Sequence, residues 1–338
     1  MLRRILFLLL ALAAALTAGW YALQRDDIGY DRLELVYGKP DSRIATLENG
    51  LRVHYRDTGP RKAPVIVLVH GFSASLHTWD AWVSDLKRDY RVIALDLPGH
   101  GLSTCGDASE IGVDQFVATV DALTTKLGVD RFVLAGNSMG GRTAWSYALA
   151  HPQRLDGLVL VDASGWPPEE ADKKSEPVVF RLLANPLARR LMKNLDSTML
   201  VRSGLKDSFS DDAFVTEEMV NRYVALGRAP CHRDAIMTLS AARGKDAPAT
   251  AAGLAAISVP TLILHGEEDN LVPVSAGRKF EAAITGSELV VYPATGHLPQ
   301  EEVAARSVAD LRDFLARRVF VEAEGAGAGA TSPNGAAH

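Results

Sequence analysis

Cysteines are scarce in this sequence, and their number and spacing exclude several classes of protein. Two cysteines, Cys105 and Cys231, occur among 338 residues, which is too few for a disulfide framework. Neither lies in a CxxC pair or beside histidines at metal-ligand spacing, so we expect no zinc site. A disulfide between them is an alternative if the domain is exported. Nothing in the sequence fixes the distance between the two cysteines, so we do not expect this disulfide.

The chain also lacks any long basic run. Lysine and arginine number 36 against 41 acidic residues, for a formal net charge of −5, and the two signs are mixed along the chain. A protein that follows a phosphate backbone needs a basic stripe, so we expect no nucleic-acid partner. The 47% of hydrophobic residues suffices for a buried sheet covered by helices, which favours one catalytic domain with appendages.

The N-terminus combines two arginines with a long uncharged segment. Arg3 and Arg4 precede residues 5–24, which carry no charge, and Arg25 follows them. Twenty helical residues reach ~30 Å, enough to cross the hydrocarbon core of a bilayer. The arginine pair favours a cytoplasmic N-terminus, so residues 1–25 are predicted to anchor the chain, with the catalytic part on the extracytoplasmic side.

A cleaved signal peptide is the alternative for the same segment. It would give a secreted or periplasmic enzyme. No clean A-x-A cleavage site lies between Ala18 and Arg25, which favours the anchor.

From residue 44 onward, apolar segments of strand length alternate with stretches long enough for helices. Residues 44–47 and 51–55 flank Asn49-Gly50, a dipeptide that favours a tight hairpin turn. Runs without alternation are typical of parallel strands buried on both faces, which predicts an α/β fold with a mostly parallel sheet. These fully apolar runs lie at residues 65–69, 92–95, 132–135, 158–161, 261–264 and 289–292.

The regular spacing breaks between residues 164 and 260. Helix-like segments around residues 178–195 and 217–226, without a convincing buried strand, predict a helical insertion between two strands. Residues 321–338 are rich in glycine and alanine and are predicted to be a disordered tail. The expected organisation is therefore a connector, a split core and a helical cap, at residues 26–43, 44–163 with 261–320, and 164–260.

A G-x-S-x-G motif joins a predicted buried strand to a helix-prone stretch. It reads Gly136-Asn137-Ser138-Met139-Gly140. In this context the glycines allow a sharp turn that exposes the serine hydroxyl beside a helix N-terminus. Ser138 is therefore the candidate nucleophile, and it needs a base within hydrogen-bond reach because a serine hydroxyl is a weak nucleophile.

His297 and Asp269 are the candidate base and acid. Each follows a predicted strand, and together with the serine they have the chain order Ser, Asp, His. Asp269 would hold the imidazole tautomer and stabilise the imidazolium. Glu267, Glu268 and Asp162 stay open as alternative acids. Three other histidines at strand ends or in turns are interpreted as structural: His70, His100 and His265.

Acyl transfer also needs donors to the developing oxyanion. The backbone N–H of Met139, next after the candidate nucleophile, is one candidate. The second is the N–H of Phe72, in the loop after residues 65–69, where Gly71 permits an unusual backbone.

These motifs together resemble those of the α/β-hydrolase fold family over roughly residues 44–320. The resemblance implies an eight-stranded, mostly parallel sheet, a helical cap and a Ser-Asp-His triad, and it implies no metal or organic cofactor. The motifs that carry it are His70-Gly71-Phe72, Asp96-Leu97-Pro98-Gly99-His100-Gly101-Leu102-Ser103, Gly136 to Gly141, Asp269 and Gly296-His297.

Within that family the chain is most similar to lipases and esterases of the monoacylglycerol-lipase-like group. This implies cleavage of small-molecule carboxylic esters with apolar acyl groups, through an acyl-enzyme on Ser138. The turn around Ser138 also resembles that of carbon–carbon hydrolases acting on ring-cleavage products, but those typically have Trp where this chain has Leu298. A non-catalytic binding protein on the same fold is expected to lack a triad residue, and none is missing.

Overall fold

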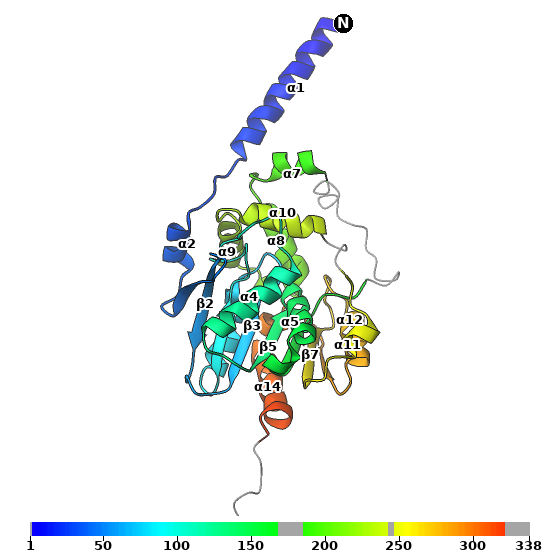
Figure 1. Ribbon diagram of the computed structural model, residues 1–338. Coiled ribbons are helices and arrows are strands. Elements are labelled where there is room, and N and C mark those ends of the chain that lie inside the picture. The colour runs from blue at the N-terminus through cyan, green and yellow to red at the C-terminus, as the bar shows by residue number, and fades with distance from the viewer. Residues whose placement is uncertain (1, 168–184, 243–246, 322–338) are drawn as a thin grey trace, which may run out of the picture.

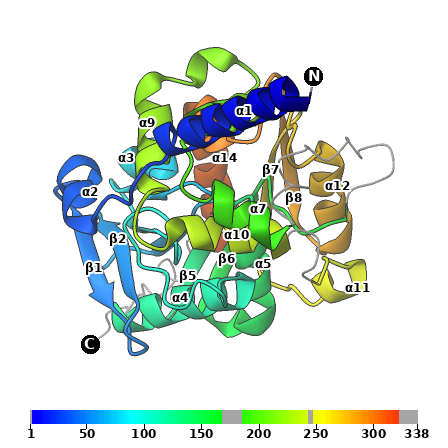
Figure 2. The same ribbon diagram turned by 90° about the horizontal axis from the view of Figure 1, so that it is seen from above.

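An eight-stranded sheet forms the centre of the protein, with helices on both faces (Figures 1 and 2). The computed structural model describes residues 2–167, 185–242 and 247–321. The strand order is β1-β2-β4-β3-β5-β6-β7-β8, and all neighbouring pairs are parallel except β1 with β2 and β2 with β4. This confirms the predicted α/β fold with a mostly parallel sheet. The strands are β1 (Ser42–Thr46), β2 (Arg52–Thr58), β3 (Val65–Val69), β4 (Arg91–Leu95), β5 (Phe132–Asn137), β6 (Leu155–Val161), β7 (Thr261–Gly266) and β8 (Glu288–Tyr292).

The antiparallel entry to the sheet is the hairpin of β1 and β2. Gly50 has φ +81°, a conformation that glycine adopts without steric cost. The N–H of Leu47 donates to the carbonyl of Leu51 at 2.8 Å across this turn. The Asn49-Gly50 dipeptide therefore lies in the turn for which it was expected.

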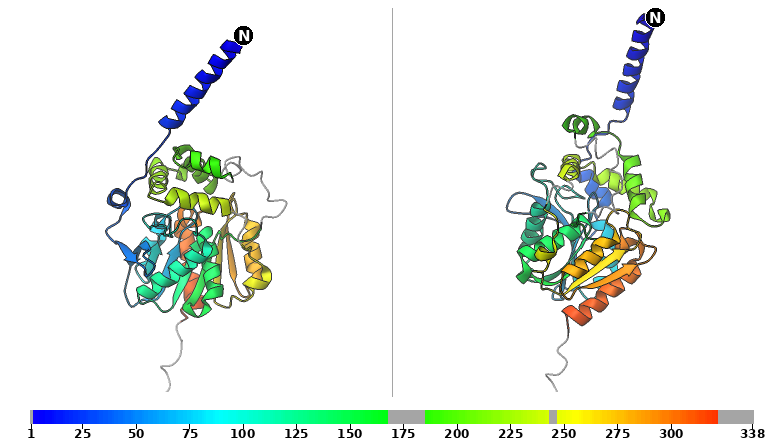
Figure 3. Two further views of the ribbon diagram at one scale, coloured as in Figure 1. Left: turned by 45° about the horizontal axis from the view of Figure 1, so that its top comes forward. Right: turned by 90° about the vertical axis from the view of Figure 1, so that its right-hand side faces the viewer.

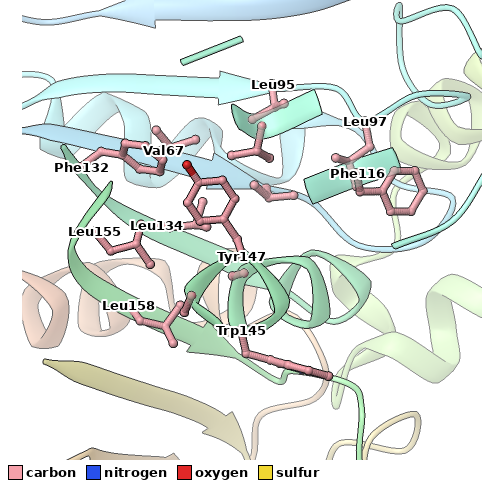
Figure 4. Close-up of a cluster of buried hydrophobic side chains, with 14 of the residues drawn as sticks. Val67, Leu95, Leu97, Phe116, Phe132, Leu134, Trp145, Tyr147, Leu155 and Leu158 are labelled. Carbon is pink, nitrogen blue, oxygen red and sulfur yellow. The ribbon is translucent and has the colours of Figure 1, made fainter. Parts of the chain in front are cut away.

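Successive residues of the central strands point to opposite faces and form two separate cores. Ile66 and Leu68 of β3 pack in the cluster that contains Trp79 and Phe314, whereas Val67 and Val69 pack in the other. Figure 4 shows part of this second cluster, in which Val67, Leu134 and Tyr147 lie near one another and Phe116 lies beside Leu97. Full burial of each such side chain stabilises the fold by about 1.5–3 kcal/mol, which explains why these strands are apolar without alternation.

Different helices cover the two faces. One face carries α4 (Val113–Lys126), α5 (Met139–Ala150), α11 (Ala251–Leu254) and α12 (Val274–Ala283). The other carries α3 (Asp80–Leu86) and α14 (Ala304–Phe314). The shorter helical segments of the core are η1 (Leu76–Trp79), η2 (Pro152–Arg154), α13 (Pro299–Glu302) and the π-helical η5 (Leu315–Val319).

Between β6 and β7 the described chain contains helices but no strand, and the helices that precede α11 lie over the carboxyl ends of the strands (Figures 1 and 3). Thr216 caps α9 by accepting a hydrogen bond from the N–H of Met219 at 3.1 Å, which explains where that helix begins. The helix expected around residues 178–195 falls partly outside the described residues, and α7 occupies the rest. The helices are α7 (Pro186–Met192), α8 (Thr198–Ser208), η4 (Asp212–Phe214), α9 (Glu217–Leu226) and α10 (His232–Ala242). We refer to them together as the cap.

The N-terminal helix α1 (Leu2–Ala22) projects away from the body of the molecule (Figures 1 and 3). Residues 3–22 of it are long and apolar enough to cross a membrane, and none of them is buried. Residues 26–43, expected as a connector, include the helix α2 (Tyr30–Tyr37) and the start of β1. Leu33 of α2 is buried against Leu226 and Ala229, so one apolar face of this segment packs on the cap.

Cys105 and Cys231 form a disulfide, so the expectation that they stay apart is wrong. Their Cα atoms are 6.3 Å apart although they are separated by 126 residues in sequence. The bridge joins the segment after β4 to the start of α10. The expected disordered tail at residues 321–338 lies almost entirely outside the described residues.

Candidate active site

The candidate nucleophile lies in the sharp turn between β5 and α5. Ser138 has φ 56° and ψ −115°, a conformation that costs a non-glycine residue about 1–3 kcal/mol. Its N–H donates to the carbonyl of Val161 at 2.9 Å, and its carbonyl accepts from the N–H of Arg142 at 3.0 Å. A Cβ on Gly140 would lie 2.2 Å from the carbonyl oxygen of Val69, so only glycine fits there. Close packing of α5 on β3 thus holds the half-buried Ser138 at the helix N-terminus.

His297 and Asp269 are hydrogen-bonded to each other beyond the ends of β8 and β7. Nδ1 of His297 and Oδ2 of Asp269 are 2.6 Å apart, and both side chains are buried. Oδ1 of Asp269 accepts from the N–H groups of Leu271 at 2.7 Å and Val272 at 2.9 Å. Burial opposes ionisation of Asp269, but His297, together with His265 and the hydrogen bond from Val272, lowers the pKa of Asp269 below its ordinary value. An ionised carboxylate accepts the Nδ1 proton, which leaves Nε2 of His297 as the basic nitrogen.

Two hydrogen bonds place the backbone of His297 between the candidate nucleophile and the cap. Its carbonyl accepts from Nδ2 of Asn137 at 3.1 Å, and its N–H donates to the carbonyl of Ser208 in α8 at 2.7 Å. Asn137 directly precedes Ser138, so the loop of His297 is tied to the turn of the serine. No hydrogen bond among the described residues joins the Ser138 hydroxyl to His297 itself. Catalytic hydrogen bonds often tighten only when substrate binds.

His70 orients the peptide group that contains the Phe72 N–H. Nδ1 of His70 lies 2.7 Å from the carbonyl oxygen of Gly71, and its Nε2 accepts from the N–H of Leu97 at 3.0 Å. Since Nε2 is an acceptor, Nδ1 carries the proton, and burial lowers the pKa of His70 in favour of this neutral form. Carbonyl and N–H point in opposite directions in a trans peptide. The Phe72 N–H therefore points away from His70.

The two candidate oxyanion donors flank the serine. A Cβ built on Gly71 would lie 3.1 Å from the Ser138 Cβ, so the loop with Phe72 passes close to the nucleophile's turn. Met139 begins α5, where the first N–H groups have no acceptor within the helix. In the described part of the chain, neither the Phe72 N–H nor the Met139 N–H donates a hydrogen bond. Both N–H groups therefore lack an acceptor within the described structure.

Comparison with known proteins identifies the family. Residues 64–304 match the family model described as alpha/beta hydrolase fold. The chain belongs to the alpha/beta hydrolase fold family. It is therefore a hydrolase, and the family resemblance stated from the sequence is confirmed.

Similar proteins include several kinds of alpha/beta hydrolase. A bifunctional esterase/perhydrolase of Acinetobacter calcoaceticus is 33% identical over 262 residues, which cover 75% of this chain and 91% of the relative. A 2-hydroxy-6-oxononadienedioate/2-hydroxy-6-oxononatrienedioate hydrolase of Paraburkholderia phymatum is 30% identical over 287 residues, covering 80% and 94%. The solved structure of a membrane phospholipase A, a bacterial virulence factor, is 26% identical with a TM-score of 0.69, and covers 93% of this chain and 98% of its own.

A second buried carboxyl group, Asp162, lies beside the histidine–aspartate pair of this hydrolase. It directly follows β6, and its Oδ1 accepts from the N–H of Gly266 at 2.9 Å. Asp162, Asp269 and His297 each place one potential metal-ligating atom within 4.8 Å of the others. Asp269 and His297 are already in contact at 2.6 Å, closer than two ligands of one ion at bond lengths of about 2 Å, so a hydrogen-bonded cluster fits this geometry better than a metal centre.

The other residues weighed from the sequence do not approach His297 as an acid would. Glu267 and Glu268 are both exposed. His265 and His100 are buried and hydrogen-bond to backbone carbonyls at 2.9 and 3.0 Å, as expected of structural histidines.

Sequence reasoning missed the role of Asp96, a buried carboxylate that organises two loops of the site. Its oxygens contact Nδ1 of His54 at 2.6 Å, the N–H of Leu76 at 2.7 Å and the N–H of Leu102 at 2.9 Å. Burial opposes its ionisation, but His54, together with His70 and His77, lowers the pKa of Asp96 below its ordinary value. The available signal was an aspartate directly after a buried strand, but its histidine partner is 42 residues away and no motif links them.

A cavity of about 300 Å³ lies between the core and α9 of the cap, away from this site. Charged groups line it, among them Arg222 and Glu301, and it contains none of the residues Ser138, Asp269 and His297. It therefore belongs to the junction between cap and core rather than to the candidate active site.

Proposed function

We propose that this alpha/beta hydrolase cleaves carboxylic esters, with Ser138 as nucleophile, His297 as general base and Asp269 as the orienting acid. The observation that supports this most is the 2.6 Å hydrogen bond between Asp269 and His297, on a loop that Asn137 ties to the serine. This hydrogen bond leaves Nε2 of His297 as the basic nitrogen. The loop that carries it is next to the turn of Ser138, whose hydroxyl must lose a proton in the reaction.

The reaction proceeds through an acyl-enzyme. Nε2 of His297 takes the Ser138 proton as Oγ attacks the ester carbonyl carbon, and the N–H groups of Phe72 and Met139 bind the oxyanion. When the oxyanion collapses, the ester C–O bond breaks and the imidazolium returns its proton to the leaving alcohol. A water molecule then gives a proton to His297 as it attacks the acyl carbon. The bond from that carbon to Oγ breaks and the imidazolium returns the proton to Oγ, which releases the acid and restores the serine. The Asp269 carboxylate stabilises the imidazolium at both stages.

The activity is tested with the purified full chain in detergent. Wild type should react with a fluorophosphonate probe and turn over p-nitrophenyl esters and monoacylglycerols. Ser138→Ala should remove both labelling and turnover, because it removes the hydroxyl that the proposed reaction uses as nucleophile. Labelling that persists in a folded Ser138→Ala variant would refute the assignment of the nucleophile.

Hydrolysis of a carbon–carbon bond is the second candidate, because a 30% identical relative hydrolyses an oxo-dienedioate. We favour esters because Leu298, which is buried directly after His297, stands where carbon–carbon hydrolases typically have Trp. The ratio of kcat/KM for a vinylogous diketone ring-cleavage product to that for a simple ester decides between the two. A ratio near one or above would refute the preference for esters.

For the location, we propose that α1 stays attached as a single membrane span with the hydrolase on the extracytoplasmic side. The end of α1 and the chain after it are bound to the cap: Nε1 of Trp20 donates to the carbonyl of Leu191 at 2.9 Å, and Arg25 pairs with Asp196 at 3.0 Å. With α1 across the bilayer, α7 lies near its surface. Leu187 and Leu191 of α7 are 65% and 49% exposed, which suits contact with lipid.

Two further observations agree with this location and with lipid-derived esters as substrates. Disulfides persist in oxidising compartments, and the bridge between Cys105 and Cys231 suits an exported domain. One of the similar solved structures is that of a membrane phospholipase A. Both observations support the proposal.

Mass spectrometry of the N-terminus and protease access in spheroplasts of a bacterial host test the location. The expected result is an intact N-terminus in the membrane fraction and a catalytic domain that added protease digests. A mature N-terminus near Gly19 in the soluble fraction would show cleavage, and a protected domain would show that the orientation is wrong.

A further inference from the structure

Asp162 is a buried carboxyl group that the proposed reaction does not use. Its side chain is 0% exposed, and its backbone φ of 44° is unusual for a residue other than glycine. Oδ1 accepts a hydrogen bond from the N–H of Gly266 at 2.9 Å. Oδ2 is buried and has no hydrogen-bond partner among the described residues. A buried carboxylate oxygen without a donor is costly, so the protonation state of Asp162 needs an explanation.

The groups around Asp162 offer no cation that would keep it ionised. Asp269 and Glu302 are carboxyl groups, and each raises the pKa of Asp162. Nε2 of His265 lies 3.5 Å from Oδ1, but it donates to the carbonyl of Val272, and burial lowers the pKa of His265 in favour of its neutral form. His297 is already paired with Asp269.

Asp269 still has capacity to accept another hydrogen bond. Its Oδ1 takes two backbone N–H groups and its Oδ2 takes Nδ1 of His297. Two carboxylate oxygens offer about four acceptor sites, so one site is left. The potential ligand atoms of Asp162 and Asp269 lie within 4.8 Å of each other, in the same buried cluster.

We propose that Asp162 is a positioning residue that carries a proton on Oδ2 at neutral pH and donates it to the Asp269 carboxylate. The proton gives Oδ2 a partner, removes one of two like charges from the buried cluster and restrains the carboxylate that orients His297. Burial, followed by the charge of Asp269, raises the pKa of Asp162 well above its ordinary value, in agreement with this assignment. The functional consequence rests on the proposed role of Asp269, whereas the protonation itself does not.

Asp162→Asn is the variant that separates a proton donor from a carboxylate. The asparagine amide keeps a donor toward Asp269 and an acceptor toward Gly266, and asparagine tolerates positive φ. We expect Asp162→Asn to keep kcat within about 3-fold of wild type. Asp162→Ala removes the donor and should lower kcat by about 10- to 100-fold with KM little changed, the range expected for a lost hydrogen bond to a charged group.

Infrared difference spectroscopy of the full chain tests the protonation directly. The wild-type minus Asp162→Asn spectrum at neutral pH should contain the carbonyl stretch of one protonated carboxylic acid. This measurement needs no turnover and stands if Asp162→Ala does not fold, so it can fail or succeed independently of the proposed ester hydrolysis. Absence of that band, or a collapse of kcat in a folded Asp162→Asn variant, would overturn the proposal.

Discussion

Removal of the disulfide between Cys105 and Cys231 should destabilise the protein by an amount that the sequence separation sets. The two cysteines are 126 residues apart. In the chain-entropy model, opening a loop of that length costs about 5 kcal/mol at 25 °C, because the unfolded chain regains the freedom that the bridge removed. Unfolding of 338 residues has an entropy of about 0.7 kcal/mol/K, so the expected decrease in Tm is about 7 °C.

Thermal unfolding of the full chain in detergent, followed by circular dichroism, measures this decrease. The variants are Cys105→Ala, Cys231→Ala and the double variant, and reduced wild type is the matched control. Each single variant breaks the same bridge, so all three should have nearly equal Tm values, and reductant should lower only the wild-type Tm. Singles whose decreases add up in the double variant, or a reductant effect below about 1 °C, would refute the reasoning.

Three more predictions concern the turn, the acid and the junction of cap and core. Gly140→Ala should abolish turnover because its Cβ would lie 2.2 Å from the carbonyl oxygen of Val69, whereas Gly204→Ala, with no atom within 4 Å, should leave kcat/KM unchanged. Asp269→Asn should lower kcat by up to about 10⁴-fold through loss of the productive tautomer, and a near-normal rate would refute Asp269 as the acid. Burial raises the pKa of Glu301 to about 7 from an ordinary value of 4.5, so the unfolded chain loses this proton first and stability falls as pH rises between the two values. Glu301→Gln should therefore be more stable than wild type at pH 8 by about 3 kcal/mol, and no more stable at pH 4.5, in urea titrations; equal stability at pH 8 would contradict this.

The parts of the fold that could be predicted are those whose environment leaves a local mark on the sequence. A parallel strand buried on both faces must be apolar at every position, so β3 is recognisable from its five residues alone. The helix α2 leaves a weaker mark on the sequence: Leu33 is its buried residue, whereas the apolar residues Leu35 and Val36 are exposed. Leu33 packs against Leu226 of the cap, and no local sequence pattern predicts that contact.

The residues of the candidate site also differ in how well a local sequence pattern predicts their contacts. The turn of Ser138 is local in part: a Cβ on Gly136 would lie 2.1 Å from the carbonyl oxygen of Gly140 within the motif, whereas a Cβ on Gly140 would meet Val69 of β3. The motif alone was enough to predict the candidate nucleophile. Asp162 was visible only as an aspartate at a strand end. Its relation to Gly266 spans 104 residues, and the spacing of residues in sequence does not tell whether a strand-end carboxyl group points toward the histidine or toward another carboxyl group.

The contacts of Asn137 show what the chain order Ser, Asp, His could not predict, namely how the loop of His297 is held beside the turn of Ser138. The motif allows any residue at that position, yet here its side chain donates both to the carbonyl of Val161, at 3.3 Å, and to that of His297, at 3.1 Å. One amide thus joins β5, β6 and the loop after β8 around the strained Ser138. A strained turn persists only where its surroundings over-determine it, and these hydrogen bonds come from segments far apart in sequence. The G-x-S-x-G motif therefore predicts the strained turn at Ser138, and hydrogen bonds from distant segments hold the backbone in that conformation.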